Sequence, residues 1–203
     1  LIDKREIANG SSSATTAMLQ YEVDKPLYQL NEIIGAKGAE KCFWACHDAI
    51  DKLEQVCKDV NSKAGFRKKK SLYFAARKKD VSWLQKEYQS RKQAGFDVSW
   101  LDAQDIKKKY DLEHTYGGIL STQGASVDAF KLVHEILDFN VKKGLQVFDK
   151  TALQTVKYGK KYNECTLSTG ATIRAKKNIY CVGYESQSMV KEKFVNLIST
   201  YAV

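Results

Sequence analysis

Apolar residues recur at every third or fourth position over three long stretches of the chain, and this spacing predicts amphipathic helices. The stretches are Lys37–Lys63, Val81–Ala94 and Ser126–Lys143. A glycine follows each of them within two residues, as is common directly after a helix. A shorter helix is predicted over Ala103–Tyr110.

Short runs rich in β-branched and aromatic residues fill much of the remaining chain and predict strands separated by turns. The predicted strands are Leu72–Ala76, Gly117–Leu120, Thr151–Tyr158, Tyr162–Ser168 and Ala171–Arg174. The run Asn178–Gly183 is continuously apolar in its centre, which is typical of a strand buried on both faces.

The two ends of the chain also carry predicted elements. Leu1–Asp3 has the pattern of the last residues of a strand, Gln187–Ile198 that of a helix, and Thr200–Val203 that of another strand. We therefore expect both ends to cut through elements of a longer protein.

Composition fits a globular protein with a sizeable core. The chain has 203 residues, of which 43% are hydrophobic and 28% charged, enough for one large or two small domains. No apolar run approaches the roughly 20 residues of a membrane-spanning helix, and no signal peptide is visible. The expected location is the cytoplasm, without a transmembrane segment.

The five cysteines match no disulfide framework. Cys42, Cys46 and Cys57 share one face of the first predicted helix, so we expect them to be buried, reduced thiols. Three residues separate Cys42 from Cys46, whereas zinc knuckles and haem attachment sites use a spacing of two. The sequence therefore predicts no metal site.

The formal net charge is +9, and basic residues cluster at Arg67–Lys70, Arg77–Lys79, Lys107–Lys109 and Lys176–Lys177. Such clusters can bind phosphates, so a basic α+β module that binds nucleic acid without catalysis is the alternative function. The clusters are dispersed among 24 acidic residues, however, and few aromatic residues stand among them to stack on bases. A solvated, lysine-rich surface is the favoured interpretation.

Three positions could contact a dinucleotide, although each pattern alone is common. Asp3 ends a strand, where a carboxylate can accept hydrogen bonds from both hydroxyls of an adenosine ribose. The loop Gly10–Leu19 has small and hydroxyl-bearing residues that can approach a phosphate, or that simply cap a helix. Gly183 ends the last predicted buried strand and permits close approach of a ligand.

In their order, these pieces resemble the D-amino-acid-oxidase-type family of FAD-dependent oxidoreductases, which includes glycine oxidase, sarcosine oxidase and glycerol-3-phosphate dehydrogenase. The motifs that carry the resemblance are Asp3-Lys4-Arg5, Gly10–Leu19, Gly124–Phe130, Lys143–Phe148 with Thr151–Leu153, and Cys181-Val182-Gly183 followed by Ser186. They cover nearly the whole chain, and Cys181-Val182 stands where the family usually has Ala-Thr.

The resemblance implies an α/β fold with an α+β part. An incomplete FAD/NAD(P)-binding, Rossmann-like domain would be interleaved with a mixed-sheet substrate domain. The FAD-binding domain would comprise residues 1–67 and 124–186, and the substrate domain residues 68–123 and 187–203.

The resemblance also implies FAD as the cofactor and hydride transfer to the flavin from an amine, an amino acid or a hydroxy acid. The implied contacts are Asp3 with the ribose, Lys4 or Arg5 beside the adenine, Ser11 and Ser12 at the pyrophosphate, Thr16, Ala17 and Met18 at the flavin ring, the backbone of Leu153 at the adenine, and Gly183 close to the cofactor. No catalytic acid or base is expected in this chain, because the flavin carries the chemistry and the histidines are isolated.

Two departures from the family pattern shape these expectations. The fingerprint Gly-x-Gly-x-x-Gly, expected within roughly 30 residues before the ribose-binding acid, does not occur in the sequence. The family segment that returns to cover the flavin would follow Val203. We therefore expect an internal fragment of a longer enzyme that is inactive alone and binds FAD weakly. No histidine stands in Ser11–Met18, so a histidine-linked flavin is not supported.

Overall fold

The computed structural model describes residues 1–192, apart from the side chains of residues 185, 188 and 189. The helices are α1 (Ser11–Ala14), α2 (Leu27–Ile34), α3 (Ala36–Asp59), α4 (Val81–Gln93), α5 (Ala103–Tyr110) and α6 (Ala129–Val141), with 3-10 segments η1 (Lys78–Asp80) and η2 (Gly183–Met189). The strands are β1 (Met18–Gln20), β2 (Arg67–Phe74), β3 (Val98–Leu101), β4 (Gly118–Ser126), β5 (Leu153–Lys157), β6 (Asn163–Leu167) and β7 (Thr172–Ala175).

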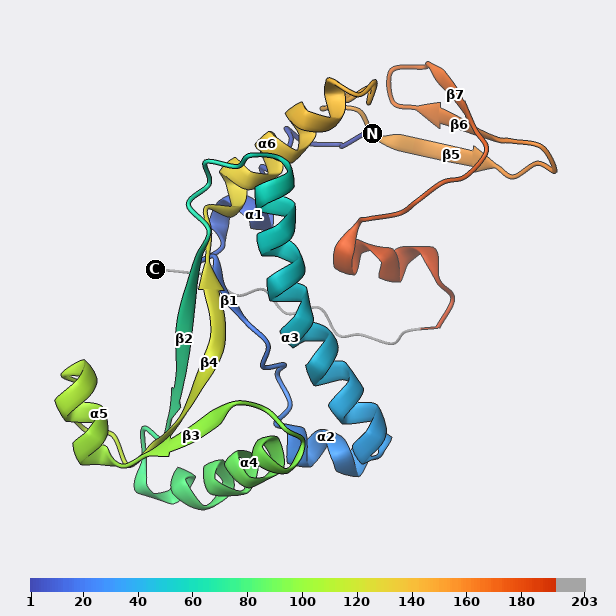
Figure 1. The fold of residues 1–203 in the computed structure, drawn as a ribbon. Coiled ribbons are helices and arrows are strands. Elements are labelled where there is room, and N and C mark those ends of the chain that lie inside the picture. Colours follow the sequence, from blue (N-terminus) through green and yellow to red (C-terminus); the bar gives the residue numbers. More distant parts are fainter. Residues whose placement is uncertain (193–203) are drawn as a thin grey trace. The chain divides into compact units, whose positions relative to one another are not determined.

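The chain forms two compact units, which are described separately (Figure 1). Unit 2 is the continuous segment Thr15–Phe139. Unit 1 combines Leu1–Ala14 with the chain from Asn140 onward. The two units are defined by contacts between residues, whereas the predicted domains are defined by the cofactor or substrate that each would bind. The predicted domain boundaries therefore stay a prediction.

Unit 2 is built on a four-stranded antiparallel sheet whose central strand is β4. β2 pairs with β4 along its whole length on one side. β1 and β3 pair with the two ends of β4 on the other side. A register shift between Lys69 and Ser71 marks a β-bulge in the β2–β4 pair.

The long helix α3 and the helix α4 supply the core on one face of this sheet (Figure 1). Ala39, Phe43 and Ile50 recur on α3 at intervals of four and seven residues, so one stripe of the helix faces the strands. These side chains are buried with Leu84 of α4 and Ile119 of β4.

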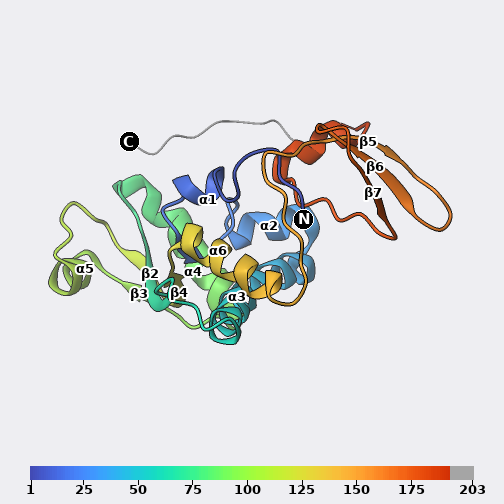
Figure 2. The same ribbon diagram turned by 90° about the horizontal axis from the view of Figure 1, so that it is seen from above.

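Unit 1 holds a three-stranded antiparallel meander in the order β5-β6-β7, whose strands lie side by side in Figure 2. Near it, the N-terminal segment runs parallel to residues 146–148, with an isolated bridge between Ile2 and Phe148. Cys165 and Leu167 of β6 are the buried apolar side chains among the described residues of this unit.

Most predicted elements are confirmed. The helices over Lys37–Lys63, Val81–Ala94 and Ala103–Tyr110 correspond to α3, α4 and α5, and the predicted meander corresponds to β5, β6 and β7. The helix predicted from Ser126 begins only at Ala129, because Ser126 still pairs with β1 and β2 at the end of β4.

Two predictions near the C-terminus need comment. The predicted buried strand Asn178–Gly183 is wrong: the segment pairs with no strand in the described chain, and Ile179 is 85% exposed. An apolar run becomes a buried strand only where neighbouring strands accept its backbone hydrogen bonds. The predicted helix Gln187–Ile198 coincides with η2 only at Gln187–Met189, and its residues 193–198, like the predicted strand Thr200–Val203, lie outside the described residues.

The cysteines are free thiols, as expected, but they are not all buried. Cys57 and Cys165 are buried, whereas Cys42 is exposed and Cys46 is half-buried. The apolar stripe of α3 passes through Phe43 rather than through Cys42, because the bulkier ring fills the space against the sheet.

Candidate cofactor-binding site

The N-terminal residues of unit 1 are fixed by backbone hydrogen bonds to the segment before the meander. The amide of Asp3 donates to the carbonyl of Phe148 at 3.0 Å, and the carbonyl of Asp3 accepts from the amide of Thr151 at 2.8 Å. The half-buried Asp3 side chain accepts a hydrogen bond from the backbone amide of Arg5 at 2.9 Å. The carboxylate thus follows an isolated parallel bridge at Ile2, where the sequence predicted the last residues of a strand.

Lys4 and Arg5 follow in an exposed turn that continues this pairing. The amide of Lys150 donates to the carbonyl of Arg5 at 3.0 Å, and the Lys150 ammonium lies 2.8 Å from Glu6 Oε1. The hydrogen bond from Lys150 holds the pKa of the Glu6 carboxyl below its ordinary value. The turn beside Asp3 is therefore rich in cationic side chains.

Leu153 begins β5, two residues after the Thr151 amide that contacts Asp3. Leu153 pairs with Leu167, and a bulge follows it before Thr155. The structure thus brings together two of the residues predicted to contact adenosine, Asp3 and Leu153, although 150 positions separate them in the sequence.

Ser11 and Ser12 open the four-residue helix α1. The turn is closed by Ser13, whose amide and hydroxyl both donate to the carbonyl of Gly10, at 3.2 and 2.8 Å. The predicted loop Gly10–Leu19 therefore contains one helical turn. The structure places both serines at its start, and their role at a pyrophosphate stays a prediction.

Thr16, Ala17 and Met18 belong to unit 2, since the boundary between the units falls after Ala14. Ala17 has a φ of 54°, a left-handed conformation that is unfavourable for a residue with a Cβ. Its amide donates to Thr15 Oγ1 at 3.1 Å, and its carbonyl accepts from Val127 at 3.3 Å. Strained residues of this kind cluster at ligand-binding sites.

Met18 is the first residue of β1, and its side chain is 70% exposed. An apolar side chain of this size at the start of a strand is available for contact with a flat ligand. The predicted contact with the flavin ring is compatible with this exposure and stays a prediction.

Gly183 is exposed, begins η2 and has a φ of 55°. A Cβ added there would meet no atom within 4 Å. The glycine is therefore favoured by the backbone conformation and not by close packing in this chain. It reaches this position from an irregular segment and not from the strand that was predicted.

The sequence did not reveal a polar cluster in the core of unit 2. Arg91 of α4 is 1% exposed, and its guanidinium lies 2.6 Å from Glu87 Oε1 and 2.7 Å from Glu22 Oε1. Burial alone would lower the pKa of Arg91, but the two carboxylates outweigh this effect and raise it. The four-residue spacing of Glu87 and Arg91 indicates an ion pair within one helix. Glu22 lies 69 residues away in the sequence, so its contact with Arg91 could not be predicted.

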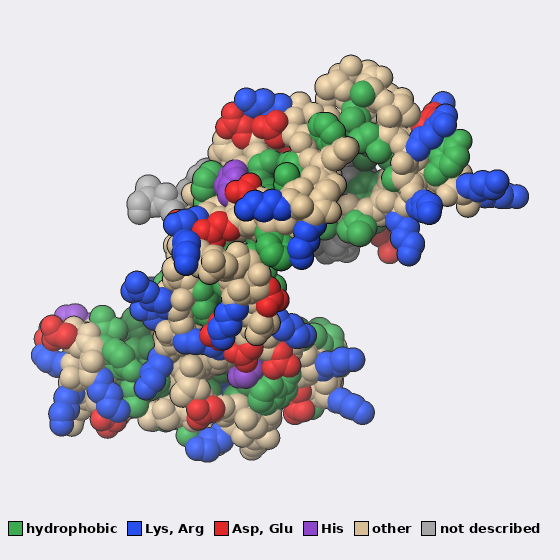
Figure 3. All heavy atoms as spheres, turned by 45° about the horizontal axis from the view of Figure 1, so that its top comes forward, with side chains coloured by type: hydrophobic (Ala, Val, Ile, Leu, Met, Phe, Trp, Pro, Cys, Tyr) green, Lys and Arg blue, Asp and Glu red, His purple; other side chains and the backbone are tan. Residues whose placement is uncertain are grey.

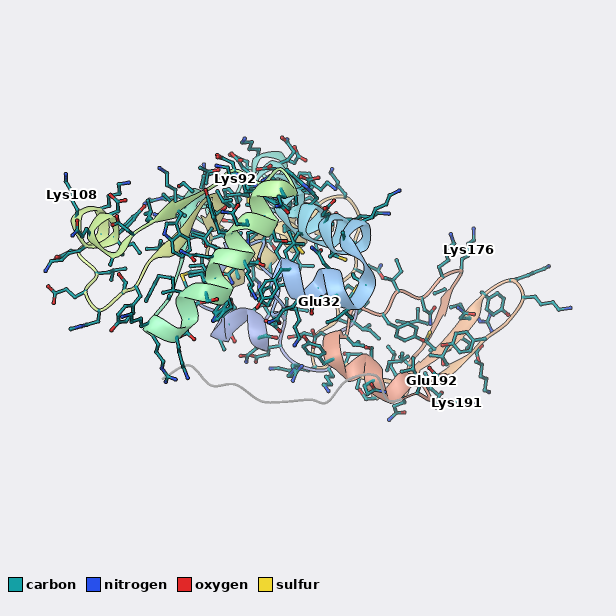
Figure 4. All side chains as sticks on the ribbon, turned by 90° about the horizontal axis from the view of Figure 1, so that it is seen from below. Glu32, Lys92, Lys108, Lys176, Lys191 and Glu192 are labelled. Carbon is teal, nitrogen blue, oxygen red and sulfur yellow. The ribbon has the colours of Figure 1, made fainter. Side chains whose placement is uncertain are left out.

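Charged side chains are spread over the surface. Figure 3 shows Lys and Arg interspersed with Asp and Glu on the face that it displays, without one continuous basic stripe. Lys108 of α5 and Lys176 after β7 point away from the elements that carry them (Figure 4). This distribution lends no support to a nucleic-acid interface.

A family model described as FAD dependent oxidoreductase matches residues 1–202 of the chain. The chain belongs to this family of FAD-dependent oxidoreductases. The resemblance noted from the sequence motifs is thereby confirmed, and so is FAD as the cofactor of the family to which the chain belongs.

Solved structures with the same fold include glycine oxidases and an L-amino acid deaminase. Glycine oxidase from Bacillus cereus superposes with a TM-score of 0.65 at 15% identity, covering 86% of this chain and 45% of that protein. Glycine oxidase from Geobacillus kaustophilus gives a TM-score of 0.65 at 18% identity, with 86% and 46% covered. L-amino acid deaminase from Proteus vulgaris, with its specific insertion deleted, gives 0.67 at 11% identity, with 87% and 44% covered.

The chain therefore spans less than half the length of these proteins. The predicted fold class, helices and strands in the FAD-binding arrangement of this family, is confirmed by the superpositions. None of the curated proteins compared with the chain by sequence matches it. Among the described residues, no helix combines the length and the hydropathy that a bilayer span requires.

Proposed function

We propose that the protein containing this chain is a flavoenzyme that oxidises a small amine, amino acid or hydroxy acid by hydride transfer to FAD. The family match over residues 1–202 is the observation that carries this proposal. When bound, the flavin supplies the hydride acceptor. The protein chain supplies binding, orientation and exclusion of water.

Asp3 is the residue of this chain that best fits the adenosine ribose. Its backbone is fixed on both sides by the bonds to Phe148 and Thr151, so the side chain leaves a rigid position. A carboxylate there can accept from both ribose hydroxyls. Lys4 or Arg5 beside the adenine, and the backbone of Leu153 near it, complete the proposed adenosine contacts.

The remaining proposed contacts are assigned from the family resemblance. Ser11 and Ser12 would donate to the pyrophosphate, and Gly183 would lie close to the cofactor without a side chain. Thr16, Ala17 and Met18 would approach the flavin ring. The exposed Met18 side chain and the strained Ala17 support this assignment.

In the proposed domain organisation, residues 1–67 and 124–186 bind the cofactor, and residues 68–123 and 187–203 bind the substrate.

We also propose a cytoplasmic location, supported by five free thiols, since reduced cysteines are usual in that compartment. Cell fractionation with an antibody to the protein tests the location, and recovery in a secreted fraction would contradict it.

The absorbance spectrum of the purified full-length gene product tests the flavoenzyme proposal. We expect the spectrum of an oxidised flavin, either on isolation or after addition of FAD. The 203-residue chain alone serves as the comparison and should retain FAD weakly. A full-length protein that is colourless and takes up no FAD would contradict the proposal.

A further inference from the structure

Two basic runs of the sequence meet at one end of the meander in unit 1. β5 ends at Lys157, β6 begins at Asn163 and β7 ends at Ala175. Because successive strands run in opposite directions, these three positions lie at the same end, and the register pairs Asn163 with Ala175. The runs Lys157–Lys161 and Lys176–Lys177 therefore lie close together in the fold.

Hydrogen bonds from one side chain hold the two runs together. The amide of Gly159 donates to Asn163 Oδ1 at 3.4 Å, and Asn163 Nδ2 donates to Asn178 Oδ1 at 3.3 Å. The turn is tight, since a Cβ at Gly159 would lie 2.5 Å from a carbonyl oxygen on its other side. The runs thus form one surface, the basic end of the meander, which comprises residues 157–162 and 174–180.

The basic end carries a strong excess of positive charge. Glu164 is the only acidic residue between Thr151 and Gly183, and it lies 3.5 Å from Arg174 in an ion pair. Within residues 1–192, no carboxylate forms an ion pair with any of the five exposed lysines, which are Lys157, Lys160, Lys161, Lys176 and Lys177. The Lys176 side chain points away from the strands (Figure 4). The lysines therefore remain available to an anionic partner.

Tyrosine side chains stand among these lysines. Tyr158 is 73% exposed, Tyr162 43% and Tyr180 39%. The hydroxyls of Tyr158 and Tyr180 form a hydrogen bond of 2.9 Å, and the Arg174 guanidinium lies 5.1 Å from the centroid of the Tyr162 ring. Tyrosine is enriched where a bilayer meets water, because its ring is apolar and its hydroxyl is polar.

We propose that the basic end of the meander docks on the surface of an anionic lipid bilayer. Anionic headgroups attract clusters of lysines without requiring a fixed geometry, and the tyrosine rings lie at the level of the headgroups. The inference goes beyond the proposed function, because neither FAD nor a substrate enters the argument.

The same charges could attract a single-stranded nucleic acid, but the aromatic rings fit that partner less well. Binding of single strands uses open ring faces on which bases stack. Arg174 covers one face of Tyr162, and the hydrogen bond between Tyr158 and Tyr180 fixes both of these rings. Apart from Arg174, which is paired with Glu164, the cations of the basic end are lysines, which bind phosphates as point charges. The bilayer is therefore the favoured partner.

Sedimentation of the full-length protein with lipid vesicles tests the docking surface. We expect vesicles of equal parts phosphatidylserine and phosphatidylcholine to bind the protein about tenfold more strongly, or better, than vesicles of phosphatidylcholine alone. Binding should weaken when the salt concentration rises from about 0.1 M to about 1 M, because the screening length falls from about 10 Å to about 3 Å.

Variants of the hairpin turn separate charge from apolar contact. Lys160→Gln/Lys161→Gln should lower binding to the anionic vesicles about tenfold to thirtyfold, since each lysine near the surface contributes a factor of about five. Tyr158→Ser should lower it severalfold without a change of charge. The matched control is Lys108→Gln/Lys109→Gln, which removes two exposed charges from α5 of unit 2 and should leave binding nearly unchanged. Circular dichroism verifies that each variant is folded.

Several results would overturn the docking surface. They are equal binding to both kinds of vesicle, equal losses in the two double variants, and no binding to vesicles at all. Binding of a single-stranded oligonucleotide without binding of anionic vesicles would assign the basic end to nucleic acid and overturn the proposal as well.

The flavin content of the same samples separates this inference from the proposed function. A protein that takes up no FAD but shows the expected vesicle binding would contradict the flavoenzyme proposal and leave the docking surface standing. A flavoprotein without the vesicle binding would retain the proposed function and overturn the docking surface.

Discussion

Arg91 and Glu87 form an ion pair that is sealed inside unit 2, with 1% and 0% of their side chains exposed and 2.6 Å between Arg91 Nε and Glu87 Oε1. The second oxygen of Glu87 accepts from the amide of Tyr28 at 3.2 Å, at the start of α2. The rings of Tyr21, Phe43 and Tyr73 surround the guanidinium at 5.6 to 5.8 Å. The pair therefore connects α4 with α2 and with the end of β1 through Glu22.

Removal of one partner from this pair should be strongly destabilising. Arg91→Met leaves two carboxylates buried without a cation, and we expect a loss of about 3–5 kcal/mol in the free energy of unfolding. Urea unfolding followed by tryptophan fluorescence measures this loss, since Trp44, Trp83 and Trp100 all lie in unit 2. The helix pair of Glu54 and Lys58, whose side chains are 31% and 64% exposed, provides the control, and Glu54→Gln should cost less than about 0.5 kcal/mol. Equal losses of stability in Arg91→Met and Glu54→Gln would contradict the stabilising role of the buried ion pair.

Gly117 should tolerate no side chain. Its φ is 112°, and a Cβ would lie 2.6 Å from the Trp100 ring. We expect Gly117→Ala to destabilise unit 2 by about 2–4 kcal/mol, through overpacking together with backbone strain. Gly144 has a φ of 97° but open space around it, so Gly144→Ala should show the strain alone, about 1–2 kcal/mol. Thermal unfolding of both variants makes the comparison, and a smaller loss at Gly117 than at Gly144 would contradict it.

Glu135 should make folding dependent on pH in the acid range. Its carboxylate accepts from the Ser62 hydroxyl and, at 3.0 Å, from the Lys63 amide, and the Ser62 bond lowers the pKa of Glu135 below its ordinary value of 4.5. The Glu135 carboxylate therefore binds a proton less readily in the folded state than in the unfolded state. Its contribution to the free energy of unfolding is fully present above pH 4.5 and is lost as the pH falls through the lowered pKa.

Urea unfolding at neutral pH and near pH 3 measures this dependence. Glu135→Gln should reduce stability at neutral pH and should lose less stability than the unaltered protein on acidification. If Glu135→Gln and the unaltered protein lose the same stability on acidification, the assignment to Glu135 is wrong.

Asp3 should control affinity for FAD if it binds the ribose. Asp3→Asn removes the charge from the acceptor, and we expect FAD affinity of the full-length protein to fall about tenfold to a hundredfold. Glu6→Gln, three residues away and paired with Lys150, should change affinity little. Titration with FAD, followed by flavin fluorescence, measures both. Unchanged affinity in Asp3→Asn would remove Asp3 from the proposed site.

The sequence alone determined the helices α3, α4 and α5 and the family. Helix periodicity is a local property, so α3, α4 and α5 could be predicted from spacing, and α3 and α4 also from the glycines that follow the predicted stretches. The order of the motifs from Asp3 to Gly183 pointed to the FAD-dependent oxidoreductases, which the match over residues 1–202 confirmed.

Only the tertiary structure decided which polar side chains meet. Arg91 contacts Glu22 across 69 residues of sequence, and the position of β2 in the sheet turns Lys68 toward α3 and Arg67 to the opposite face. The segment Asn178–Gly183 also depends on the tertiary structure. Its apolar pattern predicted a strand, but no strand of the described chain pairs with it. A helix closes its backbone hydrogen bonds within its own segment, whereas strands, buried ions and binding sites require partners that the fold brings from elsewhere.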